Sequence, residues 1–213
     1  MTARFPFYVA LWCLGCASPA LAHPHVFVDA RTGFQFDEAG RLHALRITWT
    51  YDAFTSLTLF DILDLDKDND GVLDDADRAA IVAGETEWPD DYKGDTYLEQ
   101  DGQDVPLAKP INGVASLADD RITVSFDLPL AEPIEVAEGV VLKLYDPNYY
   151  YAYTVIDLEA VSTEACRAEL DPFIADQATA ELQDKLALLS REETPEQDGV
   201  GRLFADQVRL LCA

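Results

Sequence analysis

An aspartate-rich interval at residues 66–77, DKDNDGVLDDAD, carries the clearest chemistry in the sequence. Asp66, Asp68 and Asp70 occupy the first, third and fifth positions of the twelve-residue EF-hand calcium loop. Gly71 occupies the sixth position, where the chain must turn sharply. Calcium prefers six to eight oxygen ligands, and carboxylates at every second residue of a curling backbone supply them. The interval therefore predicts a Ca²⁺ site.

The second half of this loop completes the predicted ligand set. Val72 would contribute its backbone carbonyl, Asp74 would act through water, and Asp77 would close the loop, while Leu73 is the usual apolar residue at the eighth position. An aspartate at the twelfth position lacks the extra methylene of glutamate, so the affinity falls or magnesium is tolerated. A solvated acidic turn is the alternative interpretation. Because only one such loop is visible, a structural role for the ion is favoured over switching.

Two of the three histidines, His23 and His25, flank Pro24. If the mature chain begins at His23, its α-amine and ring nitrogen could hold one ion, with His25 or His43 as a further ligand. Such donors suit Ni²⁺, Zn²⁺, Co²⁺ or Cu²⁺. An N-terminal copper site could also support oxidative enzymology. In the other interpretation, the histidines simply lead into the first strand.

The value of His23 as a ligand depends on the first 22 residues. They carry one charge, Arg4, then an apolar run and Ala20-Leu21-Ala22, which fits a signal peptidase site. We expect residues 1–22 to be a signal peptide cleaved after Ala22, and the chain to be exported. A lipid anchor at Cys16 is the alternative. No later apolar run approaches the roughly 20 residues of a membrane helix, so we expect no membrane span in the mature chain.

The net charge limits the classes of partner that the chain can bind, and the cysteines indicate its compartment. The chain has 40 acidic and 15 basic residues, a formal net charge of −25, which repels nucleic acid and anionic lipid. Outside the leader only Cys166 and Cys212 remain. An oxidising compartment favours a disulfide between them, and the alternative dithiol metal site lacks a CxxC spacing.

The elements that must position these residues can be read from hydrophobic periodicity. Alternation at 25–37 and 42–52 predicts a β-hairpin. Apolar residues such as Phe54, Leu57 and Phe60 or Ile62 recur at three-to-four spacing, which predicts a short helix before the acidic interval, and 75–85 repeats the pattern after it.

The remaining chain returns mostly to strands. We expect strands within 96–107, 121–130, 139–146, 149–161 and 202–212, and one amphipathic helix over 171–193. In the tyrosine-rich run at 149–153, Tyr149, Tyr151 and Tyr153 should share one strand face, either as packing or as a binding surface. The predicted fold class is α+β. Residues 23–213 should form a single, mainly antiparallel, sandwich-like β domain with an EF-hand-like helix-loop-helix inserted at about 53–84 and a C-terminal helix.

No hydrolase elbow, glycine-rich phosphate loop or HExxH motif is present in the sequence, so we do not expect an enzyme.

The chain resembles the bacterial exported family called domain of unknown function 1007. Five sequence blocks carry the resemblance, in this order: HPHVFVDA, WTYDAF, DKDNDGVLDDAD, LYDPNYYYAY and FADQVRLLC.

The resemblance spans nearly the whole mature chain. Members are described as periplasmic components of an ABC-type transport system, and they often occur beside membrane exporters or permeases of the nickel/cobalt class. The resemblance therefore implies a periplasmic metal-handling protein whose partner is a membrane metal transporter. It supplies no catalytic residues. The chain is short for a two-lobed substrate-binding protein and shows no βαβ alternation, so an accessory role is expected, with a calcium-stabilised structural or adaptor module as the alternative.

Overall fold

The computed structural model describes residues 23–90, 92–136, 139–190 and 193–212. The predicted signal peptide, residues 1–22, lies outside them. The helices are α1 (Ala53–Ile62), α2 (Asp75–Thr86), α3 (Gln177–Leu186) and the 3₁₀ helix η1 (Val200–Phe204). The strands are β1 (Val26–Phe36), β2 (Leu42–Tyr51), β3 (Thr96–Gln100), β4 (Gln103–Asp104), β5 (Ile111–Ala118), β6 (Arg121–Ile134), β7 (Val140–Leu144), β8 (Tyr151–Leu158), β9 (Cys166–Asp171) and β10 (Gln207–Cys212).

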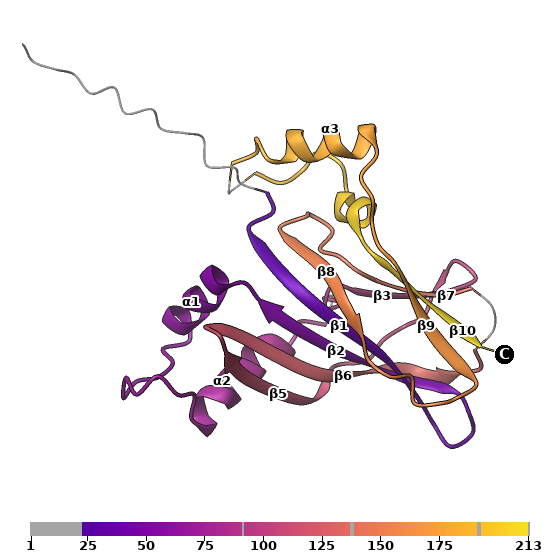
Figure 1. Ribbon diagram of the computed structural model, residues 1–213, viewed down its shortest axis with the longest axis horizontal. Helices are drawn as coiled ribbons and strands as arrows, with labels where there is room; N and C mark the ends of the chain where they lie inside the picture. The colour runs from indigo at the N-terminus through magenta and orange to yellow at the C-terminus, as the bar shows by residue number, and fades with distance from the viewer. Residues whose placement is uncertain (1–22, 91, 137–138, 191–192, 213) are drawn as a thin grey trace, which may run out of the picture.

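The strands form two five-stranded sheets, in the orders β5-β6-β2-β1-β8 and β4-β3-β7-β10-β9 (Figure 1). β1 pairs with β8 in parallel, and the other described pairings are antiparallel. Buried side chains from both sheets belong to one hydrophobic core. The prediction of a mainly antiparallel α+β fold is confirmed.

Strand β6 shows how alternating side chains form the inner face of a sheet. Along β6 the buried residues are Ile122, Val124, Phe126, Leu128 and Leu130, each separated from the next by a half-buried residue. Successive side chains of a strand point to opposite faces, so these five lie on the core side. The three that the sequence pattern placed in this strand, Ile122, Val124 and Phe126, are fully buried.

The C-terminal third differs from the prediction in two places. The helix expected over 171–193 begins only at Gln177, because the Asp176 carboxylate accepts the Thr179 N–H at 2.8 Å and caps the helix there. The segment before it includes β9, which the sequence reading missed. The strand expected over 202–212 starts with η1 and becomes extended only in β10.

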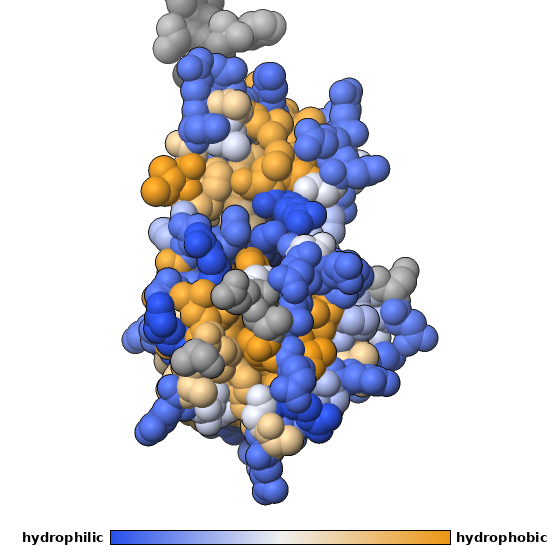
Figure 2. Space-filling view, turned by 90° about the vertical axis from the view of Figure 1, so that its right-hand side faces the viewer, coloured by the Kyte–Doolittle hydropathy of each residue, from blue (hydrophilic) through white to orange (hydrophobic). Residues whose placement is uncertain are grey.

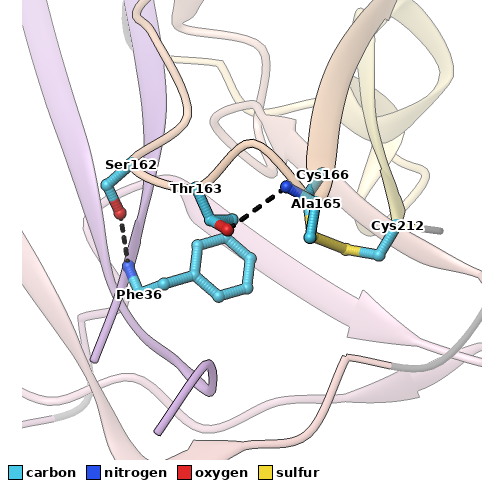
Figure 3. Close-up of a disulfide and its surroundings, with 6 residues drawn as sticks. All are labelled: Phe36, Ser162, Thr163, Ala165, Cys166 and Cys212. Carbon is cyan, nitrogen blue, oxygen red and sulfur yellow. Dashed lines mark hydrogen bonds between the residues drawn. A yellow bond between two sulfur atoms is a disulfide. The ribbon is translucent and has the colours of Figure 1, made fainter. Parts of the chain in front are cut away.

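A disulfide joins Cys166 in β9 to Cys212 in β10, as the cysteine count predicted (Figure 3). The loop before β9 is fastened to the end of β1, because the Ser162 hydroxyl accepts the Phe36 N–H at 2.8 Å. The ring of Phe36 extends beneath this loop toward the disulfide (Figure 3). The bond fits an oxidising compartment. Within the ranges that the structure describes, no helix is long and apolar enough to cross a membrane.

Candidate metal-binding sites

The acidic loop lies between α1 and α2, at the outer end of the molecule away from the second sheet (Figure 1). Helix α1 begins after Asp52, whose carboxylate accepts the Thr55 N–H at 2.9 Å. Helix α2 begins after Asp74, which forms a capping box with Asp77. The predicted helix-loop-helix is therefore present, with both helix boundaries set by side-chain caps.

Three carboxylates converge in the first half of the loop. Asp66, Asp68 and Asp70 can each place one oxygen within 4.8 Å of the others, and they are the one such group of three found among the residues that the structure describes. The Asp66 carboxylate also accepts the backbone N–H groups of Asp70, at 3.0 Å, and Gly71. These bonds curl the chain around the first carboxylate.

Backbone conformation explains why the chain turns here. Asp66, Asn69 and Gly71 have φ angles of 51°, 58° and 79°, which lie in the left-handed region. Aspartate, asparagine and glycine are the residues that adopt this region at least cost. The chain can therefore reverse direction within a few residues, between Asp66 and Gly71.

Two apolar side chains attach the loop to the body. Leu73, at the eighth loop position, is 2% exposed and belongs to the main core, and Leu65 at the start of the loop is also buried. Asp68 and Asp70, between them, are exposed. The loop is thus anchored at both sides while its acidic tip faces solvent.

The second half of the predicted ligand set is arranged differently. Asp77 Oδ1 accepts the Asp66 N–H at 3.3 Å and Asp77 Oδ2 accepts the Asp74 N–H at 3.0 Å, so this carboxylate ties the two ends of the loop together. Asp74 and Asp77 lie outside the convergent group, although with Asp68 they line a hollow of about 240 Å³. The side chain of Val72 is exposed.

The electrostatics of the loop favour a cation. Repulsion from the Asp70 carboxylate raises the pKa of Asp68. Lys67 is the basic residue within the loop, and its ammonium pairs with Asp64 at 3.1 Å, outside the loop. A divalent ion between the carboxylates would remove this repulsion, because an adjacent positive charge favours the ionised form.

The two N-terminal histidines lie together where β1 begins. The ring centres of His23 and His25 are 4.9 Å apart, and that of Tyr150 is 4.5 Å from His25. The His25 N–H donates to the Tyr150 carbonyl at 2.8 Å. His23 is 5% exposed, and its Nδ1 atom has no hydrogen-bond partner in the described part of the chain.

The third histidine does not join them. His43 is the second residue of β2, whereas the β1 end near His25 pairs with Tyr51 at the other end of β2. Eight residues of extended strand span roughly 27 Å. The expectation that His43 could be a further ligand beside His23 is therefore wrong.

The tyrosine-rich segment divides between two places. Tyr151 and Tyr153 lie on β8 with their rings stacked at 6.2 Å. Tyr149 precedes the strand in a left-handed conformation, with φ of 57°, and packs against Phe204 instead. The predicted stripe of three on one strand face is therefore wrong for Tyr149.

The structure also assembles a buried carboxylate cluster that the sequence reading missed. Tyr153 Oη donates to Asp95 at 2.8 Å, and burial raises the pKa of Asp95 to about 7. Tyr51 Oη donates to Glu85 of α2, and burial raises the pKa of Glu85 as well. Nearby, Trp49 Nε1 is buried without a hydrogen-bond partner among the described residues.

This cluster left little trace in the sequence. Asp95 and Glu85 lie in segments far from β2 and β8 in the sequence, so residue spacing could not predict their contacts with the tyrosines of those strands. The density of aromatic residues around Trp49 and Tyr153 was the one available signal. Asp95 and Glu85 each accept a hydrogen bond from a buried tyrosine, which is the kind of environment where functional acids are often found.

Comparison with known proteins confirms the family resemblance that the sequence blocks indicated. The family model described as "Protein of unknown function (DUF1007)" matches residues 8–212. An uncharacterized protein of Haemophilus influenzae is 26% identical over 206 residues, which cover 90% of this chain and 92% of the relative. This chain belongs to the DUF1007 family.

Proposed function

We propose that this is an exported, non-enzymatic metal-binding protein that holds Ca²⁺ in the loop at residues 66–77 and assists a membrane transport system for a transition metal. The observation that supports calcium binding most directly is the convergence of the Asp66, Asp68 and Asp70 carboxylates. Three oxygens cannot satisfy calcium alone. The Val72 carbonyl, Asp77 and water would complete the six to eight ligands that the ion prefers.

The ligand chemistry favours calcium over softer ions. Carboxylate, carbonyl and water oxygens suit Mg²⁺, Ca²⁺ and Mn²⁺, whereas Zn²⁺ and Cu²⁺ select imidazole or thiolate. Asp77 is shorter than the usual glutamate, so binding should be weaker than in loops closed by glutamate. The ion would hold α1 and α2 at a fixed distance, which is a structural role.

Calcium should raise the thermal stability of the purified protein. At free calcium tenfold above its dissociation constant, the free energy of unfolding should increase by about 1.4 kcal/mol. For a chain of this size that corresponds to a rise in melting temperature of about 3–6 °C. Differential scanning fluorimetry with a calcium series after treatment with a chelator measures the shift.

A pair of matched variants shows whether the effect comes from the loop. Asp66→Asn with Asp70→Asn should abolish the shift. Asp119→Asn with Asp120→Asn removes the same charge from another turn, where φ angles of 51° and 59° suit asparagine, and should leave the shift intact. An equal shift in both double variants would rule out calcium binding at residues 66–77.

A transition-metal site at His23 and His25 is the second part of the proposal. Two imidazoles that share one tetrahedral ion, with metal–nitrogen bonds of about 2.0–2.1 Å, have ring centres about 5 Å apart. The observed separation is 4.9 Å. The buried Nδ1 atom of His23, which has no partner in the described part of the chain, is a second indication. The α-amine of a chain beginning at His23 would add a third donor.

Calorimetric titration of the mature chain with Zn²⁺, Ni²⁺, Co²⁺ and Cu²⁺ tests this site. We expect one equivalent to be lost in His23→Ala and in His25→Ala, and retained in His43→Ala, which removes an imidazole from the far end of β2. Unchanged stoichiometry in the first two variants would leave a calcium-stabilised adaptor as the better interpretation. Copper-dependent turnover of peroxide or oxygen would contradict a non-enzymatic role.

A further inference from the structure

Three large apolar side chains of α1 face solvent, although Leu59 and Phe60 on the other side of the helix pack against the core. Phe54 is 74% exposed, Leu57 is 69% exposed and Ile62 is 70% exposed. At about 100° per residue, Leu57 and Ile62 lie about 60° and 80° from Phe54 in opposite directions, so the three positions share one broad side of the helix. A helix on a domain surface normally has polar side chains on its outer side, whereas α1 is apolar on both sides.

Polar contacts hold α1 in this orientation. Thr55 and Ser56 are its buried residues, and the Ser56 hydroxyl accepts the Ile122 N–H of β6 at 2.9 Å. Leu59, Phe60 and Leu63 pack partly against the core from the same inner side. Phe54, Leu57 and Ile62 therefore face outward because Thr55, Ser56 and the inner apolar side chains fix the opposite side of α1 to the core.

Phe27 extends this apolar surface onto β1. Its backbone N–H donates to the Asp52 carboxylate at 3.1 Å, and the Asp52 N–H donates to its carbonyl at 3.0 Å, which places it beside the start of α1. Its side chain is 55% exposed, and it also borders a hollow toward β8 and η1. We call Phe27, Phe54, Leu57 and Ile62 the α1 surface.

The size of the α1 surface is significant for a chain of this kind. With about 150–200 Å² for each large apolar side chain, the exposed fractions amount to roughly 400–500 Å². The largest apolar patch on a monomeric protein usually lies in this range and is often functional. Figure 1 places α1 at the periphery, beyond the end of the sheets.

The charges around the α1 surface indicate the character of its partner. Residues 52–66 contain four aspartates and no lysine or arginine; the loop adds Asp68 and Asp70 and one lysine, Lys67, which pairs with Asp64. The opposite side of the molecule also has apolar areas, but hydrophilic side chains interrupt them (Figure 2). Anionic lipid is repelled by the acidic rim, whereas a basic rim on a protein partner would complement it.

We propose that the α1 surface is a docking site for a basic amphipathic helix of a partner protein. Apolar side chains on such a helix would cover Phe54, Leu57 and Phe27 by packing against α1, as one helix packs on another. Its lysines or arginines would face Asp52, Asp61 and Asp64. This docking site depends on exposed apolar side chains and acidic charge, and the metal sites do not. Either proposal can therefore be disproved without affecting the other.

A synthetic helical peptide with leucines on one face and lysines on the other is a suitable probe. Fluorescence anisotropy should show that Phe54→Ser with Leu57→Ser weakens binding at least tenfold. Ile174→Ser with Leu188→Ser removes two side chains that are 83% and 74% exposed at either side of α3, and should leave binding unchanged. Both variants should melt as the unaltered protein does, because they change exposed residues.

Three outcomes would overturn the proposal. The first is equal binding by the two double variants, which would indicate attraction by net charge alone. The second is concentration-dependent dimers in sedimentation that Phe54→Ser with Leu57→Ser dissociates, because the occupant would then be a second copy of this chain. The third is binding to phosphatidylcholine vesicles with the same dependence on Phe54 and Leu57 and no binding to the peptide.

Discussion

Replacing Cys166 and Cys212 together by alanine is expected to lower the free energy of unfolding by about 4 kcal/mol, because the bond closes a loop with a sequence separation of 46. Removing the cross-link restores the conformational entropy of the unfolded chain. Urea denaturation of the oxidised protein and the double variant measures the difference. Dithiothreitol should reduce the stability of the unaltered protein by a similar amount and have no effect on the variant.

The position of the bond predicts where the loss of stability becomes visible. β9 is an edge strand that pairs with β10, and Cys166 lies opposite Cys212 in that pairing. Amide hydrogen exchange in the double variant should therefore accelerate most in β9, while β1 and β2 retain their protection. Equal stability of the variant and the oxidised protein would contradict a stabilising role for the disulfide.

The acidic loop could be predicted because its geometry is local. The spacing of Asp66, Asp68, Asp70 and Gly71 lies within six residues, and the left-handed turn that it requires depends on those residues themselves. Asp74 and Asp77, by contrast, cap helix α2. A carboxylate near a helix start can bind an ion or cap the helix, and spacing does not distinguish the two.

Orientation and pairing could not be predicted from periodicity. Three-to-four spacing correctly indicated helix α1, yet Phe54 and Leu57 face outward because Ser56 is fixed to β6, 66 residues away in sequence. Strand β9 was missed because its exposed and half-buried residues, Cys166–Asp171, do not form an apolar run. Parallel pairing of β1 with β8 also depends on contacts between distant segments.

The burial of Asp95 could not be predicted from the sequence either. Asp95 follows a polar loop in the sequence and gives no sign of burial, but it is 4% exposed in the structure. Its surroundings come from the loop at Tyr92, from Tyr153 on β8 and from Asp146 before that strand. Only the fold brings these groups close enough to alter its proton affinity.

Raising the pH from 5 to 8 is expected to cost the protein about 2–3 kcal/mol of stability through Asp95. Burial raises the pKa of Asp95 to about 7 in the folded protein, whereas an unfolded aspartate has a pKa of about 3.9. Between these values the folded state holds a proton that the unfolded state releases. The contribution of Asp95 is therefore fully present at low pH and is lost as the pH rises through 7.

Asp95→Asn isolates this contribution from the other carboxylates, because asparagine stays neutral and keeps one oxygen to accept the Tyr153 hydroxyl. Chemical denaturation at pH 5 and pH 8 should give a smaller decrease for this variant than for the unaltered protein, by about 2–3 kcal/mol. Asp119→Asn, at an exposed turn, should decrease as the unaltered protein does. If Asp95→Asn and Asp119→Asn lost the same stability over this interval, Asp95 would have to be ionised in the folded state at pH 5, in contradiction to its buried position.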